Sequence, residues 1–243
     1  HTTMELKPIR TDNKEFRGNY AAAQDYALPA DSAQRVLRNT YLLLALTMVP
    51  TVVGAYIGIQ LAPAMMASPI ITVVLMLGSV IGLQFGIARY RNSGIGVALL
   101  LLMTGLVGVF LGPLLNVALS MRNGMQLVGY AAVGTGAIFL AMGTIAATTK
   151  RDFSFMGKFL FVGMIALLVA MLANMFLQIP ALALTISTLV IVVFSLFLLY
   201  DLNRIVRGGE TNYVMATTGV YISLLNIFSS LLQLLLALSG DRD

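Results

Sequence analysis

The sequence contains no cysteine and a single histidine. Without cysteine it can form no disulfide, thiolate metal site or iron–sulfur cluster, and it has no cysteine nucleophile. The histidine is His1, and residues 1–3 precede Met4, which resembles a natural start, so we expect residues 1–3 to be a cloning remnant. The rest of the chain then lacks histidine for haem ligation, zinc binding or serine–histidine catalysis. We therefore expect no catalytic residues, no metal site and no cofactor.

Charge is also scarce. Only 10% of the 243 residues are charged and 58% are hydrophobic, whereas about a quarter of an ordinary soluble domain is charged. The mean hydropathy is +0.89. Residues 39–149 contain three charged side chains, Arg89, Arg91 and Arg122, and no acid. A chain with so few polar residues cannot cover a water-facing surface, so we predict an integral membrane protein.

Seven stretches are long and apolar enough to cross a bilayer, which takes about 20 residues of helix. They lack strand-like alternation and are too long for barrel strands, so we predict an all-α protein. The least certain boundary is Gln178-Ile179-Pro180, where a tight turn would separate the fifth and sixth spans. Six spans with one long hairpin is the alternative. The seven predicted spans are residues 37–61, 69–88, 94–119, 125–148, 156–177, 181–200 and 213–238.

The basic residues indicate the orientation. Of the 15 lysines and arginines, all except Arg122 and Arg242 fall on the face that carries the N-terminus. The positive-inside rule then predicts a cytoplasmic N-terminus and, with seven spans, a periplasmic C-terminus. The net charge of +5 suits a protein whose basic residues attract the head groups of membrane lipids. We expect no nucleic acid as a partner.

The domain organisation follows from these spans. Residues 4–33 mix charges of both signs with Pro8 and Pro29 and have no sustained periodicity, so we predict a flexible cytoplasmic N-terminal tail. Residues 34–239 are the seven-helix membrane domain, and residues 240–243 are a short C-terminal tail.

Glycines and a proline mark the first three spans. The glycines recur every four residues, which lines one helix face and allows close approach of a neighbouring backbone. Packing inside the bundle is the favoured interpretation, and an oligomer or gating contact is the alternative. Pro113 predicts a bend in the third span. The glycines are Gly54 and Gly58, Gly78, Gly82 and Gly86, and Gly108 and Gly112.

Asp201 is the only acid that abuts a span, directly after Tyr200. An ionised carboxylate within lipid costs about 2.5–3.5 kcal/mol on insertion scales, so such a residue is functional by default. The alternative is an interfacial acid that pairs with Arg204, one turn on. An intramembrane aspartyl protease is excluded, because no second acid lies in any span.

A few amides lie within the spans. We assign Asn116, Asn174 and Asn226 either to interhelical hydrogen bonds, worth about 0.6–2 kcal/mol each, or to the polar lining of a pore.

Several motifs resemble those of the transmembrane Bax inhibitor motif family, and within it the bacterial YccA branch. Their order and spacing agree from residue 35 to the end of the chain. The motifs are RVLRNTY at 35–41, LGPLLN at 111–116, TTKRDFSF at 148–155, ANMFLQIPA at 173–181, GGETNY at 208–213 and YISLLNIF at 221–228.

The resemblance implies seven helices in the bacterial inner membrane, with the last helix central and surrounded by the other six. It also implies one of two activities. Calcium-leak members of the family use one aspartate on each of the last two helices as a pH-sensitive latch. Asp201 lies where the first belongs, whereas Ser223 occupies the position of the second. The candidate latch of Asp201, Ser223 and Arg204 is therefore incomplete.

The YccA branch is instead associated with the membrane AAA protease FtsH, as a substrate that can occupy and restrain it. Such a protease pulls on a free cytoplasmic end, and residues 4–31 would reach on the order of 90–100 Å at about 3.3–3.6 Å per residue. The sequence therefore favours a modulator that binds FtsH and its membrane complex and has no catalysis of its own. A calcium or cation leak is the alternative.

Overall fold

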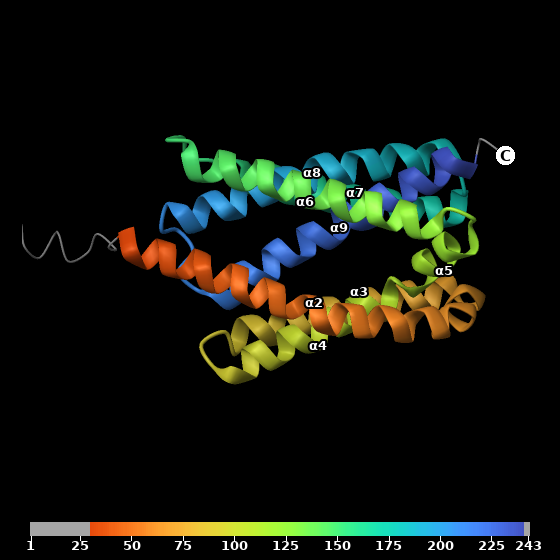
Figure 1. Ribbon diagram of the computed structural model, residues 1–243, viewed down its shortest axis with the longest axis horizontal. Coiled ribbons are helices and arrows are strands. Elements are labelled where there is room, and N and C mark those ends of the chain that lie inside the picture. Colours follow the sequence, from red (N-terminus) through yellow and green to blue (C-terminus); the bar gives the residue numbers. More distant parts are fainter. Residues whose placement is uncertain (1–29, 241–243) are drawn as a thin grey trace, which may run out of the picture.

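The computed structural model describes residues 30–240; residues 1–29 and 241–243, which include most of the predicted N-terminal tail, lie outside the described part. Residues 30–240 contain helices and no β-strand. The seven predicted spans are confirmed as seven helices long and apolar enough to cross a membrane, with α4 and α5 together forming the third. The elements (Figure 1) are α2 Ala30–Ala67, α3 Pro69–Arg89, α4 Gly94–Phe110, α5 Gly112–Ser120, α6 Gly124–Thr148, α7 Met156–Leu177, α8 Pro180–Val206 and α9 Tyr213–Gly240.

The boundary between the fifth and sixth spans is a tight turn, as predicted, and the six-span alternative is wrong. Gln178 closes α7 in the left-handed region with φ 52°, and its N–H donates to the Asn174 carbonyl at 2.8 Å. Ile179 is extended, and Pro180 is the first residue of α8. The Asn174 side chain holds the turn, since its Oδ1 accepts from the Ile179 N–H at 3.0 Å and its Nδ2 donates to the Ile179 carbonyl at 3.3 Å.

The predicted interruption of the third span lies at Leu111, between α4 and α5. Pro113 belongs to the first turn of α5, where a proline is tolerated because its missing N–H would have no helical partner. The departure from regular helix therefore lies two residues before the proline, at Leu111, whose dihedrals stay in the helical region (φ −74°, ψ −13°), and the span continues through it.

Helix α9 occupies the middle of the bundle. It packs against α2, α3, α4, α5, α6 and α8. Figure 1 shows it crossing obliquely between one group formed by α6, α7 and α8 and another formed by α2, α3 and α4. In the described part of the chain α7 packs along α8 and does not approach α9, so the last helix is not surrounded by all six others. The core includes Leu198, Leu202, Val220 and Ile227, all nearly or fully buried.

Glycines bring α2 into direct backbone contact with α4 and α5. A Cβ on Gly54 would collide with a carbonyl oxygen of α4, and so would a Cβ on Gly58. From the other side, Cβ atoms on Gly108 and Gly112 would collide with carbonyl oxygens of α2. The packing interpretation is therefore confirmed for the glycines of the first and third spans.

Gly78 and Gly82 of α3 behave differently, whereas a Cβ on Gly86 would lie 3.2 Å from Cδ1 of Leu99 on α4. Nothing lies within 4 Å of a Cβ placed on Gly78 or Gly82. Their helix exposes large apolar side chains such as Val74 (63%) and Phe85 (74%). This face of α3 packs against no other part of residues 30–240, and it is available to lipid.

Candidate functional site

Asp201 lies inside α8, because the helix continues to Val206 instead of ending near Tyr200 as predicted. The continuation has a packing reason. Leu202 and Ile205 are 1% and 0% exposed, and they extend the buried helix face by a further turn.

The Asp201 carboxylate faces α9 at a glycine. A Cβ on Gly219 would lie 2.9 Å from Oδ2 of Asp201, so any larger residue there would crowd the carboxylate. Asp201 is half-buried. Among residues 30–240 no hydrogen bond or ion pair reaches its side chain, since the one ion pair in that range joins Arg204 to Glu210. An ionisable residue within a membrane span is by default a candidate functional residue.

Ser223 lies one turn beyond Gly219 on α9 and is 2% exposed. Residues four apart share a helix face, so Ser223 belongs to the face of α9 that meets Asp201, one turn further along. The structure thus brings Asp201 and Ser223 to the same α8–α9 interface.

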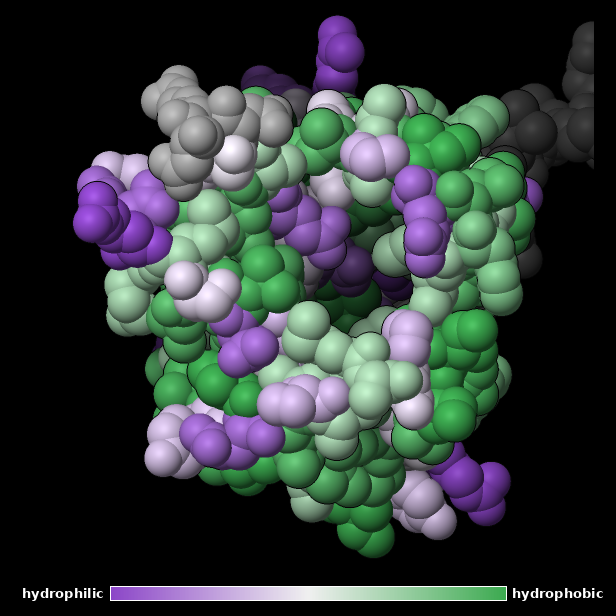
Figure 2. Space-filling model, turned by 90° about the vertical axis from the view of Figure 1, so that its right-hand side faces the viewer, coloured by the Kyte–Doolittle hydropathy of each residue, from purple (hydrophilic) through white to green (hydrophobic). Residues whose placement is uncertain are grey.

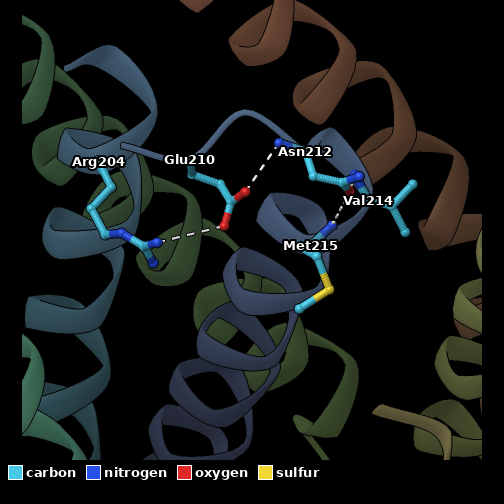
Figure 3. A network of polar contacts seen from close by, with 5 residues as sticks. All are labelled: Arg204, Glu210, Asn212, Val214 and Met215. Carbon is cyan, nitrogen blue, oxygen red and sulfur yellow. Dashed lines mark hydrogen bonds and ion pairs between the residues drawn. The ribbon is translucent and has the colours of Figure 1, made fainter. Parts of the chain in front are cut away.

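Arg204 forms its ion pair with Glu210 rather than with Asp201. Its Nη2 lies 3.6 Å from Oε2 of Glu210 (Figure 3), and its guanidinium lies over the Tyr200 ring at 5.4 Å from the centroid. The pairing of Asp201 with Arg204, which was the alternative interpretation of Asp201, is therefore not the arrangement found. The side chains of Arg204 and Glu210 are 34% and 22% exposed, so their pair contributes about 0–1 kcal/mol.

Glu210 connects this pair to the start of α9. Its Oε1 accepts a hydrogen bond from the Asn212 N–H at 3.0 Å. Asn212 in turn caps α9, because its Oδ1 accepts from the N–H groups of Val214 and Met215 at 3.0 Å each (Figure 3). An asparagine side chain in this position satisfies N–H groups that have no partner within the helix.

Asn203 and Arg207 attach the α6–α7 loop to the end of α8. Asn203 is 1% exposed; its Oδ1 accepts from the Phe153 N–H at 3.1 Å and its Nδ2 donates to the Arg151 carbonyl at 3.2 Å. Nη1 of Arg207 donates to the Lys150 carbonyl at 2.9 Å.

Asn212 attaches the remaining loop at this end. Its Nδ2 donates to the Arg91 carbonyl at 3.1 Å and to Oδ1 of Asn92 at 3.0 Å. Residues 203–212 therefore connect the loops 90–93, 149–155 and 207–212. We call these three loops together the basic end of the bundle (left in Figure 1). Sequence reasoning missed Asn203 and Asn212, although an asparagine directly before the apolar run at Tyr213 is a recognisable cap.

Sequence reasoning also missed a polar contact in the bundle interior. Tyr221 of α9 is fully buried, and its hydroxyl lies 2.6 Å from Oγ1 of Thr51 on α2. The Thr104 carbonyl of α4 lies 3.2 Å from the Tyr221 hydroxyl and 3.3 Å from Oγ1 of Thr51, so one hydroxyl can donate to this carbonyl while it accepts a hydrogen bond from the other. Three helices are joined at this point.

The three predicted asparagines contact different partners. Nδ2 of Asn116 lies 4.0 Å from Sδ of Met66 on α2. Asn226 donates to the Ile222 carbonyl of its own helix at 2.8 Å. Asn174 holds the α7–α8 turn described above.

The end opposite the basic end is hollowed. Figure 2 views the face where α5 and the end of α9 lie, and it shows a depression near the centre with hydrophilic residues at its rim and in its depth.

Among residues 30–240 no group of three or more histidine, cysteine, aspartate or glutamate residues could hold a metal ion.

Comparison with known proteins finds a family match and several relatives that cover most of the chain. Residues 33–240 match the family described as inhibitor of apoptosis-promoting Bax1. The chain is 40% identical over 210 residues to the modulator of FtsH protease YccA of Escherichia coli K12, covering 86% of this chain and 93% of the relative. A membrane protein of Vibrio cholerae is 41% identical over 201 residues, covering 83% and 88% of the two chains. A protein of Neisseria meningitidis is 39% identical over 220 residues, covering 89% and 97%.

Proposed function

The chain belongs to the Bax inhibitor family, and from this premise we propose that it is a regulator that binds the membrane protease FtsH and restrains it, with no catalysis of its own. The observation that carries the proposal is the 40% identity to an FtsH modulator over 93% of that protein's length. The similarity extends through the whole bundle rather than one motif. Relatives named as membrane and inner-membrane proteins place the chain in the bacterial inner membrane as a multi-pass protein.

The proposed orientation puts the basic end in the cytoplasm, in agreement with the positive-inside rule. The N-terminus would then lie on that side, and the C-terminus would be periplasmic. A protease that pulls from the cytoplasm would engage residues 4–31 and draw on α2 first.

The packing of α2 supports restraint rather than rapid degradation. Pulling α2 out of the bundle would separate the glycine contacts at Gly54 and Gly58 and break the hydrogen bond between Thr51 and Tyr221. A substrate that resists extraction occupies the protease for longer, because unfolding must precede degradation.

Deletion of residues 4–31 tests the proposal. The full chain and the deletion variant are reconstituted with FtsH, and both co-purification and the degradation rate of a second membrane substrate are measured. We expect the full chain to bind and to slow degradation, and the deletion to abolish both effects. In the control, an unrelated flexible segment of equal length replaces residues 4–31, and FtsH should again be able to pull on it. Unchanged binding and unchanged inhibition after deletion would refute this role for the tail.

A cation leak is the second candidate, and the Asp201 carboxylate, which lies beside Gly219 and has no hydrogen bond or ion pair within residues 30–240, favours it. Purified protein in liposomes should then pass calcium, and Asp201→Asn should change the flux. Asp152→Asn is the matched control, because Asp152 lies in the α6–α7 loop outside the spans. Vesicles that stay tight to calcium at every pH would rule the leak out.

A further inference from the structure

The α6–α7 loop and its surroundings form a cationic surface that neither function above uses. We call it the 150/207 surface, and it consists of Lys150, Arg151, Lys158 and Arg207, all of them exposed. Asp152 is the acid within the loop. Its carboxylate accepts a hydrogen bond from the Ser154 N–H at 2.9 Å, and this bond lowers the pKa of Asp152. The surface keeps a clear excess of positive charge.

The backbone beneath these cations is fixed in place. Asn203 bonds the loop at Arg151 and Phe153, and Arg207 bonds it at Lys150. The bond from Arg207 also places its guanidinium directly beside the Lys150 backbone. A loop whose backbone is already held in place loses less conformational entropy when a ligand binds than a free loop would.

An apolar strip continues from this surface along α7. Phe155, Phe159 and Val162 are 67%, 77% and 66% exposed, and Lys158 lies between the two phenylalanines. Positions i, i+3, i+4 and i+7 share one helix face. The strip lies on the outside of the bundle, because α7 packs on α8 alone among the described helices. Aromatic side chains at the end of a span belong at the level of the lipid head groups.

We propose that the 150/207 surface binds a phospholipid with a negatively charged head group. The phosphate would lie against the four cations, and an acyl chain would follow Phe159 and Val162 along α7. The combination of charge and strip identifies the ligand class. A free anion would make no contact with the apolar strip, and a zwitterionic lipid would gain little electrostatic attraction from the excess positive charge.

Native mass spectrometry of the full chain in detergent, titrated with phosphatidylglycerol or phosphatidylcholine, tests the proposal. The wild-type protein should bind phosphatidylglycerol more tightly. The double variant Lys150→Gln with Arg151→Gln should weaken phosphatidylglycerol binding by about fivefold per cation, the effect of about 1 kcal/mol for each charge, and leave phosphatidylcholine unchanged.

The matched control is Arg89→Gln with Arg91→Gln, which removes the same charge from the end of α3 and the loop 90–93 that follows it. It should bind phosphatidylglycerol like the wild type, whereas an equal loss in both double variants would show general attraction to the basic end and overturn the site. Phe159→Ala should weaken binding of the lipid. Inorganic phosphate should not displace phosphatidylglycerol at equal concentration, and displacement would show a site for free anions and overturn the lipid assignment.

Discussion

The same substitution, glycine to alanine, should have opposite effects at two positions in neighbouring helices. Gly58 of α2 is buried against the end of α4, and a Cβ there would collide with the Val109 carbonyl oxygen and lie 2.8 Å from its carbonyl carbon and 2.9 Å from its Cα. Gly82 of α3 is exposed, and a Cβ there has nothing within 4 Å. Both residues are in helix interiors, so their intrinsic preference for alanine is the same.

The magnitudes follow from this geometry. Replacing a helical glycine by alanine stabilises by about 0.5–1 kcal/mol when nothing else changes, and this is the expected gain in the free energy of unfolding for Gly82→Ala. At Gly58 the added methyl group meets backbone that cannot rotate away, and overpacking costs about 1–3 kcal/mol. Gly58→Ala should therefore be destabilising on balance, by up to about 2.5 kcal/mol once the propensity gain is subtracted.

Reversible unfolding in mixed micelles, followed by helical circular dichroism as the denaturing detergent fraction rises, measures both variants against the wild type. We expect the midpoint to fall for Gly58→Ala and to rise or stay unchanged for Gly82→Ala. Equal stabilisation of the two variants would refute the close approach of α2 to α4 and α5. Destabilisation by Gly82→Ala would instead show that the open face of α3 is occupied in the membrane.

Three further changes test the remaining parts of the structure. Tyr221→Phe should lower the free energy of unfolding by about 0.6–2 kcal/mol, and a double-mutant cycle with Thr51→Val should show coupling between the two positions. Additive effects would contradict their hydrogen bond. Asn203→Ala removes both contacts to the α6–α7 loop, so trypsin should cut after Arg151 faster than in the wild type; an unchanged rate would show that the loop is held without Asn203. Ser223→Asp places a second carboxylate on the face that meets Asp201, and calcium flux in liposomes should then become pH-dependent, whereas an unchanged pH profile would argue against a latch at this interface.

The candidate site could be predicted from the sequence only in part. Asp201 is recognisable because an acid next to an apolar run is costly in lipid. Its surroundings are not, since the neighbour that matters, Gly219, belongs to another helix and has no side chain to suggest a role. The expected partner, Arg204, is near in sequence but pairs with Glu210, because the loop after α8 folds back towards it.

The interior contacts illustrate the same limit. Tyr221, Thr51 and Thr104 come from α9, α2 and α4 and are far apart in the sequence. Nothing local marks them as partners, since a hydroxyl in a span can also bond to its own helix, as that of Thr135 does. Only the crossing of three helices decides which hydroxyl meets which.

By itself the sequence determined that the protein lies in a membrane, how many spans it has and where the turn at Pro180 lies. Each of these depends on local composition: the hydropathy of about 20 consecutive residues, and a proline that has no backbone N–H to donate. Tertiary structure alone decided that Gly54 and Gly58 of α2 are buried while Gly78 and Gly82 of α3 are open, and that α7 packs outside α8. It also decided that no hydrogen bond or ion pair within residues 30–240 reaches the Asp201 side chain. Lipid is as apolar as the helix surfaces, so hydropathy cannot tell which face of a span meets a helix and which meets the bilayer. Shape and a few hydrogen bonds make that choice.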